Sequence, residues 1–271
     1  MIPSPLFTII TPALNSEKTI ARTIESVLSQ SIEAFEYLII DGGSSDRTLD
    51  VIKGFNDTRI ILTSEKDSGI FNAMNKGLIK AKGLIIGIIN SDDWYAPNAF
   101  ENILASYNKN SATVFYGDVA VYENEKEISL LKPNHDSLPF NMIPHPGIFC
   151  LKDVYLRLGK FNEFFRIAAD HDFMLNAYIS GEEFLNLKLL VANYQIGGFS
   201  DIPKNRIRSI FEKYEIQSRW MNTSKFQRDR RFLVESLKTI LRRDCRIQML
   251  HELAETFALR FNKNLKKIAN E

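Results

Sequence analysis

Residues 84–93, Leu-Ile-Ile-Gly-Ile-Ile-Asn-Ser-Asp-Asp, decide the fold class, because a short apolar run ends there at a polar and acidic segment. Runs of this length and composition are typical of a strand buried on both faces of a sheet. Three earlier runs follow the same pattern, at Leu6–Thr11, Phe35–Ile40 and Ile60–Thr63. Helical patterns separate all four runs. The sequence therefore predicts an α/β protein with a largely parallel sheet that helices cover on both faces.

The helical patterns have recognisable starts and faces. Asn15 or Ser16 is expected to cap the first helix, and Asp46 to cap a second helix over Thr48–Phe55. Apolar residues recur at the spacing of one helical face in the first and third helices. These are Ile20, Ile24, Val27 and Leu28 in the first, and Ile70, Ala73, Met74, Gly77, Leu78 and Ala81 in the third.

The pattern changes after Pro97, which suits the first turn of a helix. A hairpin is predicted from Thr113–Tyr122 and Ile128–Leu131, followed by a long loop over 132–146. Further expectations are strands at 148–151, 184–191 and 193–195, a helix over 170–180, and almost only helix from Pro203 onward. We divide the chain into a sheet domain, 1–202, and a basic helical extension, 203–271.

The balance of charge differs between the two parts of the chain. The 271 residues hold 34 Lys and Arg against 33 Asp and Glu, but residues 201–271 hold 17 basic and 9 acidic residues. Apolar and charged contents of 45% and 25% exclude a disordered chain. The two cysteines, Cys150 and Cys245, have no metal-binding or disulfide-framework spacing. No apolar run approaches the length of a membrane span, so we expect a cytoplasmic protein.

Polar residues follow each of the four apolar runs, where an open α/β sheet binds ligands. They are Asn15 after the first, Asp41 after the second, Ser64–Asp67 after the third, and Asp92-Asp93 after the fourth. Carboxylates gathered in one crevice need a cation or a hydrogen-bonding ligand to offset their repulsion. Helix capping is the alternative for each Asp, but a cap at 92–93 requires only one of the two.

Taken together, these motifs resemble family 2 glycosyltransferases. The resemblance rests on residues 11–15 (Thr-Pro-Ala-Leu-Asn), 41–48 (Asp-Gly-Gly-Ser-Ser-Asp-Arg-Thr), 67–69 with 75–77, 90–93, and 197–200. It implies a GT-A fold, with a mixed, mostly parallel sheet, and inverting transfer of a sugar from a nucleotide-sugar donor. By the same resemblance, the donor-binding residues are Pro12, Leu14, Asn15, Asp41, Asp67, Lys76 and Asp92.

Two aspartates of these motifs, Asp93 and Asp41, lead to specific chemistry. Asp93 is expected to hold Mn²⁺ or Mg²⁺, which prefer carboxylate and phosphate oxygens and act as Lewis acids. Ser91 stands where the family's Asp-x-Asp motif has its first acid. An ionised Asp41 only accepts hydrogen bonds, and it therefore favours the N3–H of uracil and a UDP donor. The alternative for Asp41 is a structural role in the Asp-Gly-Gly turn.

Inverting transfer needs a base that takes the proton of the acceptor hydroxyl. The resemblance assigns this role to Asp170, with Ala169 where the family has Glu, and Asp172 is the second candidate. Helix capping is the alternative for Asp170. His145 is expected on the acceptor or diphosphate side, and His171 on the helix surface. Trp94, Tyr95 and Trp220 are expected either to stack on sugars or to lie in the core.

The sequence fits three other functions less well. A sugar nucleotidyltransferase is disfavoured because the first loop has no glycine, and a non-catalytic nucleotide-sugar-binding protein would fit Ser91 and Ala169. Nucleic-acid binding has only the basic tail in its favour. An amphipathic helix over 246–268 fits either an anionic membrane surface, where a lipid-linked acceptor lies, or another subunit. The expected partners are thus a donor, a glycan or lipid-linked acceptor, and either the membrane or a second copy of the chain.

Overall fold

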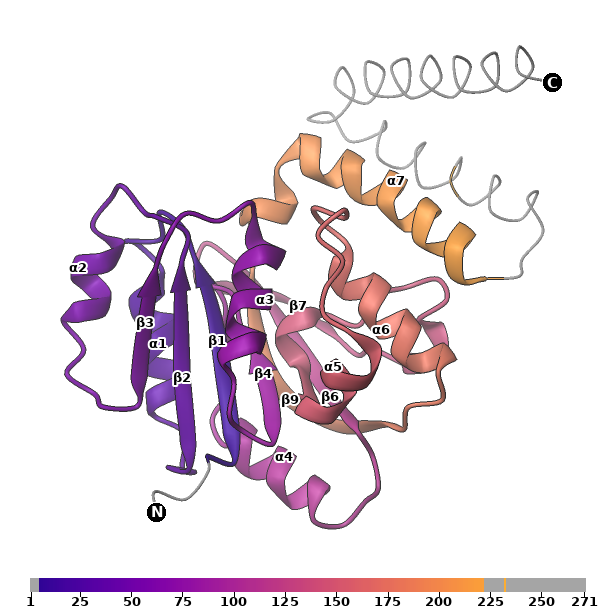
Figure 1. Cartoon of the computed structure of the whole chain (residues 1–271), viewed down its shortest axis with the longest axis horizontal. Helices are drawn as coiled ribbons and strands as arrows, with labels where there is room; N and C mark the ends of the chain where they lie inside the picture. The colour runs from indigo at the N-terminus through magenta and orange to yellow at the C-terminus, as the bar shows by residue number, and fades with distance from the viewer. Residues whose placement is uncertain (1–4, 222–231, 233–271) are drawn as a thin grey trace. The chain divides into compact units, whose positions relative to one another are not determined.

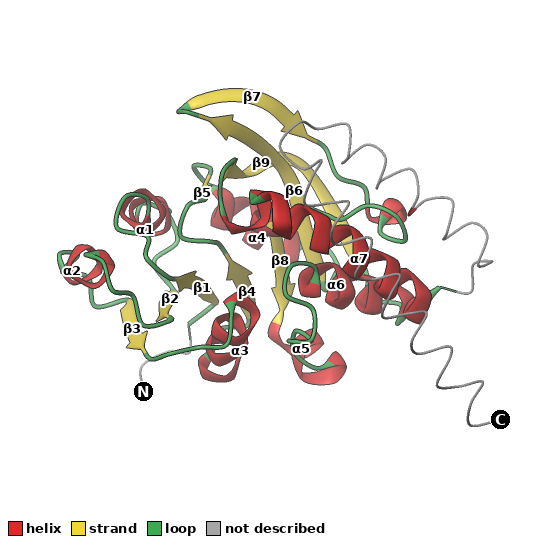
Figure 2. Cartoon of the chain, turned by 90° about the horizontal axis from the view of Figure 1, so that it is seen from above, coloured by secondary structure: helices red, strands yellow, loops and turns green. Residues whose placement is uncertain are grey.

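A computed structural model describes residues 5–221 and residue 232 of the chain. The chain divides into two compact units, residues 1–196 and 197–271. The first unit contains the whole β-sheet (Figure 1). Its strand order is β3-β2-β1-β4-β8-β6-β9-β5, with β7 paired to β6 (Figure 2).

The first half of this sheet is parallel, as predicted. β1 lies between β2 and β4, and β2 also pairs with β3, all in parallel. Helices α1 and α3 lie on opposite faces of these strands (Figure 2). The elements are β1 (Phe7–Ala13), α1 (Ile20–Leu28), β2 (Phe35–Asp41), α2 (Thr48–Lys53), β3 (Ile60–Ser64), α3 (Ile70–Lys80) and β4 (Ile85–Ile88).

The second half makes the sheet mixed, which confirms the predicted fold class. β8 runs antiparallel to both β4 and β6, while β9 runs parallel to β6. The predicted hairpin is β6–β7, and its turn residues Asn124 and Glu125 have φ of 47° and 63°. The elements are β5 (Trp94–Tyr95), α4 (Ala99–Tyr107), β6 (Val114–Glu123), β7 (Lys126–Leu131), η1 (His135–Ser137), η2 (His145–Gly147), β8 (Ile148–Leu151), α5 (Lys152–Leu158), α6 (Ala169–Ile179) and β9 (Phe184–Gln195).

Two local predictions were wrong, and one helix was missed. The strands expected at 184–191 and 193–195 form one strand, β9, because pairing with β6 continues past two register shifts on either side of Asp118. Helix α5 was not predicted. Neither Asn15 nor Ser16 is the N-cap of α1, which begins after Thr19. Instead, the Ser16 carbonyl accepts hydrogen bonds from the first turn, at 3.0 Å from both Thr19 N and Ile20 N.

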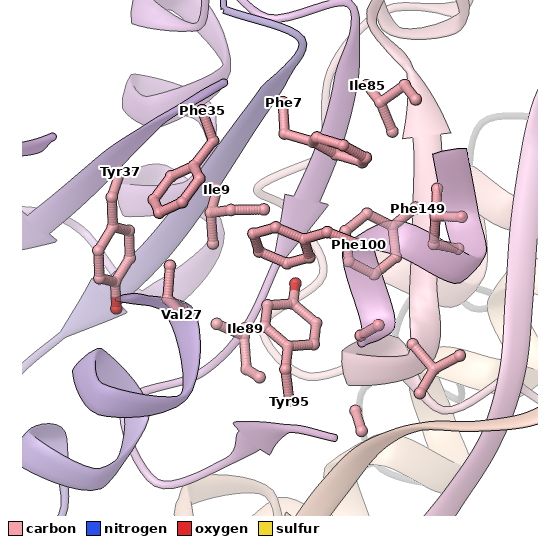
Figure 3. Close-up of a cluster of buried hydrophobic side chains, with 14 of the residues drawn as sticks. Phe7, Ile9, Val27, Phe35, Tyr37, Ile85, Ile89, Tyr95, Phe100 and Phe149 are labelled. Carbon is pink, nitrogen blue, oxygen red and sulfur yellow. The ribbon is translucent and has the colours of Figure 1, made fainter. Parts of the chain in front are cut away.

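An aromatic cluster fills the face of the sheet that α1 and α4 cover (Figure 3). Phe7 of β1 stacks on Phe100 of α4 at 5.1 Å, and Phe149 of β8 packs edge-on against both rings. Tyr95 belongs to the same cluster, with its ring 5.2 Å from Phe149. Tyr95 is thus a core residue and not a sugar-stacking one. These rings join the two halves of the sheet across one shared core.

The opposite face is closed by α3, which approaches β1 closely. A Cβ on Gly77 would lie 2.5 Å from Cγ2 of Ile10, so the helix reaches this depth only with glycine there. Met74 and Leu78 are buried beside it, as the helical pattern predicted. Close contact at Gly77 therefore sets the height of α3, and of the loop before it, above the sheet.

His145 is a buried imidazole at the end of the long loop. Its side chain is 6% exposed, its ring packs edge-on against Phe161, and neither ring nitrogen has a hydrogen-bond partner among the described residues. Burial lowers the pKa of His145 from 6.5 to about 4. The folded protein therefore holds this ring neutral at pH values where the unfolded chain protonates it.

The second unit contains η3 (Phe199–Asp201) and α7 (Pro203–Trp220) among its described residues. Pro203 stands in the first turn of α7, where a missing N–H costs nothing. Phe211 and Tyr214 pack against Phe232. The amphipathic helix predicted over 246–268 lies outside the described residues. Within residues 5–221, no helix has the length and apolarity that a membrane span requires.

The contact at Gly77 yields a stability prediction. Gly77→Ala should lower the free energy of unfolding by about 1–3 kcal/mol, because overpacking outweighs the helix propensity of Ala. Urea unfolding followed by circular dichroism measures the change. Ile79→Ala on the exposed side of the same helix is the control, expected within about 0.5 kcal/mol of wild type. A Gly77→Ala protein as stable as wild type would contradict the close packing.

The buried imidazole yields a pH prediction. Between pH 6.5 and 4 the unfolded chain binds a proton at His145 that the folded protein does not, so the unfolding free energy falls as the pH is lowered. The loss between pH 7 and pH 5 should be about 2 kcal/mol greater in wild type than in His145→Phe. Urea titrations of both proteins at the two pH values provide the test. Equal losses would show that His145 is not held neutral.

Candidate functional site

The loops after β1 and β2 are bonded to each other at the carboxyl edge of the sheet. Ser44 Oγ accepts a hydrogen bond from the backbone N–H of Asn15 at 2.8 Å, and Asn15 Oδ1 accepts one from Ser45 N at 2.9 Å. Asn15 has φ of 51°, a left-handed conformation that Asn tolerates. Asn15 thus joins two loops and leaves α1 uncapped. Leu14, beside it, is 56% exposed, whereas Pro12 is buried within β1.

Asp41 is fully buried at the end of β2, and nearby donors occupy its carboxylate. Oδ2 accepts from Gly43 N at 3.0 Å and from Ser64 Oγ at 2.6 Å, while Oδ1 accepts from Ser44 Oγ. The turn role named as the alternative is therefore present in the structure. Ser64 also links this turn to β3. A role for Asp41 at the base of a nucleotide remains a prediction.

The helix predicted after Asp46 begins at Thr48 as expected, but its N-cap residue is Arg47 and not Asp46. Asp46 bonds the start of the helix from one residue further back. Its Oδ1 accepts hydrogen bonds from both N and Oγ1 of Thr48 at 3.0 and 2.6 Å, and its Oδ2 accepts one from Glu17 N. The helix itself, α2, ends at Lys53, two residues before the predicted Phe55. Asp46 therefore connects the start of α2 to the loop after β1.

The loop after β3 packs against the same turn. A Cβ at Gly42 would lie 2.4 Å from Oδ2 of Asp67, so the Asp67 carboxylate occupies the space that Gly42 leaves. Asp67 also accepts a hydrogen bond from Gly69 N at 2.9 Å, at the start of α3. Lys76 forms an ion pair with Glu65 at 3.0 Å and donates to the carbonyl of Lys66. Asp67 thus lies against the loop after β2, and Lys76 contacts the loop after β3.

The loop after β4 is tied to the loop after β1 by two hydroxyls, because Ser16 Oγ and Ser91 Oγ lie 2.7 Å apart. Ser91 therefore supplies a contact between loops at the position where the family motif has an acid. Asp93 is fully buried, and its carboxylate accepts from Gln195 N at 3.0 Å and from Asn90 Nδ2 at 3.2 Å. Burial and the negative charge of Asp92 raise the pKa of Asp93 well above its usual range.

The residues around Asp93 fit Mn²⁺ or Mg²⁺ in their chemistry. Two adjacent carboxylates repel each other, and Asn90 Oδ1 is a buried oxygen with no hydrogen-bond partner among the described residues. A divalent cation would offset that repulsion, and both ions prefer oxygen ligands. No group of three or more His, Cys, Asp or Glu side chains in the described part of the chain could hold a metal ion. Such a cation would thus take its remaining ligands from substrate and water.

The predicted base lies on α6. Asp170 and Asp172 are 6% and 5% exposed, both in the first turn of the helix, and Asp170 Oδ1 accepts a hydrogen bond from His171 N. His171 was wrongly expected on the helix surface. It is fully buried, and its Nε2 lies 2.8 Å from the carbonyl oxygen of Leu138, so it connects α6 to the loop after η1. His145 is buried in η2, and a role for it toward acceptor or diphosphate remains a prediction.

Two groups of polar residues near these loops were not predicted. Arg22 of α1 contacts the segment after β4, and Glu163 accepts hydrogen bonds from Asn72 and Asn75 of α3 at 3.0 and 2.9 Å. The bond from Asn75 holds the pKa of Glu163 below its ordinary value. Their partners lie about 70 to 170 positions away in the chain, so no local pattern could have indicated them.

Comparison with known proteins agrees with this arrangement. The family described as Glycosyl transferase family 2 matches residues 8–167. A curated relative, the UDP-Glc:alpha-D-GlcNAc-diphosphoundecaprenol beta-1,3-glucosyltransferase WfgD of Escherichia coli, is 28% identical over 215 residues. That alignment covers 78% of this chain and 85% of the relative.

Solved structures share the fold at low sequence identity. S. aureus TarS 1-349 in complex with UDP-GlcNAc has a TM-score of 0.64 at 16% identity. The match covers 86% of this chain and 72% of the TarS chain. The mannosyltransferase PcManGT from Pyrobaculum calidifontis, in complex with GDP-Man and Mn²⁺, has a TM-score of 0.63 at 15% identity, covering 98% and 83%. These likenesses establish the GT-A fold. With its family match over more than half of its length, the chain belongs to Glycosyl transferase family 2 and is a glycosyltransferase.

Proposed function

We propose that the enzyme transfers a sugar from a UDP-sugar to a hydroxyl of a glycan or lipid-linked saccharide, with inversion and with the help of a divalent cation. The observation that carries the proposal is the bonding of the loops after β1, β2 and β4 into one edge, through Asn15–Ser44 and Ser16–Ser91. The loop after β1 carries Leu14, which is 56% exposed, and the loop after β4 carries Asp92 and the fully buried Asp93. An apolar surface next to carboxylates suits a base and a metal-bound diphosphate.

The donor would lie along this edge. Leu14 offers an apolar contact for the face of the base, and Asp92 is assigned to the ribose hydroxyls. Asp41 would have to exchange one of its present donors for the N3–H of uracil, since an ionised carboxylate accepts but cannot donate. Asn15, Asp67 and Lys76 are assigned to the same pocket, and Pro12 supports it from within β1. The TarS complex with UDP-GlcNAc supports a UDP-sugar on this fold.

The cation would be held by Asp93, with Asp92 beside it. When bound, such an ion neutralises the charge that builds on the diphosphate as the sugar leaves. The residues of the chain act around it: Gln195 and Asn90 orient the Asp93 carboxylate through hydrogen bonds at 3.0 and 3.2 Å. The neighbour with Mn²⁺ and a nucleotide sugar supports this assignment.

The base that accepts the proton of the acceptor hydroxyl is assigned to Asp170, with Asp172 as the alternative. Both carboxylates are buried in the first turn of α6, where little water competes with an approaching hydroxyl for them. His145 is assigned to the acceptor side. Because its ring is neutral, one nitrogen can accept a hydrogen bond there while the other donates.

The acceptor is assigned to a saccharide on a lipid carrier, at the inner face of the cell membrane. The Escherichia coli relative names a diphosphoundecaprenol-linked sugar in its own activity, which supports this class for the present enzyme. The positive charge of residues 201–271 would favour an anionic membrane surface. Association between copies of the chain through the same segment is the alternative.

The donor prediction concerns thermal stability. UDP-sugars with Mn²⁺ should raise the melting temperature of the full chain, because a ligand that binds only the folded state stabilises it by mass action. A thermal-shift panel would compare UDP-, GDP-, CDP- and dTDP-sugars with and without Mn²⁺. The stabilisation should be largest for UDP compounds and smaller without the metal. No shift with any UDP compound would exclude the donor assignment.

The base prediction concerns two neighbouring variants. Asp170→Asn should lower kcat by about 10²–10⁴-fold, because the amide cannot take the proton, while binding of UDP stays unchanged. Asp172→Asn, equally buried two residues later, is the matched control and should keep most of its activity. Transfer rates and UDP binding would be measured on both. Activity retained in Asp170→Asn and lost in Asp172→Asn would move the base to Asp172.

A further inference from the structure

Arg22 of α1 lies at the centre of a network that surrounds the Asp92-Asp93 segment. Its guanidinium lies over the ring of Trp94 at 3.6 Å, directly after the two acids in the chain. Its Nη2 lies 3.5 Å from the carbonyl oxygen of Asp92 and 3.4 Å from Oε1 of Gln195. One planar group therefore contacts both the acidic segment and the end of β9.

The same network reaches the Asp93 carboxylate. Gln195, whose side chain faces Arg22, donates its backbone N–H to Asp93 Oδ1 at 3.0 Å. The adjacent residue of α1, Thr23, donates its hydroxyl to the Asp93 carbonyl at 2.7 Å. Arg22 and Thr23 of α1 thus contact the backbone of Asp92 and Asp93. Gln195 of β9 bonds the Asp93 carboxylate.

Arg22 is itself held by the tip of the β6–β7 hairpin. Glu125 accepts hydrogen bonds from Arg22 Nη1 with both carboxylate oxygens, at 3.1 and 3.0 Å. The Arg22 side chain is 29% exposed and that of Glu125 is 81% exposed, so the pair contributes little stability by itself. The pair matters through its geometry: it directs Nη1 to the hairpin and leaves Nη2 directed to the acidic segment.

We propose that Arg22 is a positioning residue that sets the Asp92-Asp93 segment in the arrangement that binds a divalent cation with a nucleotide diphosphate. The proposal rests on the proposed function for the cation, but the placement of the segment can be tested without it. Lysine cannot replace Arg22, because its single ammonium lacks both the flat face over Trp94 and the fork that reaches two partners. Residues behind the ligands of a metal commonly change its affinity by about 10- to 100-fold.

The chain offers a matched control in Arg59. Its guanidinium bonds Asp57 through two nitrogens at 2.9 and 2.6 Å, lies over the ring of Phe35 at 4.5 Å, and contacts the Leu28 carbonyl. Its side chain is 26% exposed, close to the value for Arg22. Arg59 precedes β3, at the end of the strand opposite to the loop that contains Asp67. Arg59→Lys thus removes the same kind of contacts away from the site.

The test compares Arg22→Lys with Arg59→Lys in two measurements on the full chain. The first is amide hydrogen exchange of the peptide over residues 90–95 without ligand, which should be faster than wild type only in Arg22→Lys. The second is a Mn²⁺ titration in saturating UDP, followed by the paramagnetic resonance signal of free Mn²⁺. The half-saturating Mn²⁺ concentration should rise about 10-fold or more in Arg22→Lys and stay unchanged in Arg59→Lys.

The outcomes separate this proposal from the proposed function. Unchanged exchange over residues 90–95 in Arg22→Lys, or an equal increase in Arg59→Lys, would overturn the positioning role. Faster exchange together with an unchanged Mn²⁺ midpoint would overturn its link to the cation. Failure of Mn²⁺ to bind wild type with UDP would remove the metal from the proposed function, and with it the cation part of this proposal, while faster exchange would still support the positioning of the segment by Arg22.

Discussion

Parallel pairing of β1 with both β2 and β4 is the constraint on which the rest of the structure depends. It places the carboxyl ends of these strands side by side, so the polar residues that follow each strand meet at one edge. Backbone groups that leave the sheet there still need partners, and Asn15 and Ser44 supply them across the gap. The candidate site is therefore formed by the loops at the ends of these strands.

The core around this constraint explains why the edge stays in place. Phe7 of β1 packs against Phe100 and Phe149, from elements on the far side of β4, so the two halves of the sheet cannot slide separately. On the other face, Gly77 lets α3 approach Ile10 closely enough to bring the Asp67 loop against Gly42. Packing on both faces thus fixes the loops that the hydrogen bonds then connect.

Burial of Asp93 beside Asp92 has an energetic cost. A buried carboxylate next to a second one is unfavourable in its charged form, and the hydrogen bonds from Gln195 and Asn90 offset only part of this. A divalent cation bound here would offset the repulsion between the two carboxylates. Arg22 contacts the same segment. These contacts fit a role in fixing where the two carboxylates lie, and they contribute little to the stability of the fold.

Local patterns predicted most of the strands, the hairpin and the acidic residues that follow the strands, because apolar runs and turn residues act over a few positions. Asp41, Asp92 and Asp93 were predicted as site residues in this way, and the family was identified from the same motifs. The tertiary structure alone decided that Ser91 and Asn15 bond to other loops, that His171 and His145 are buried, and that Arg22 meets Trp94, Gln195 and Glu125. Such contacts join residues about 30 to 170 positions apart, and only the closing of the sheet brings them within reach.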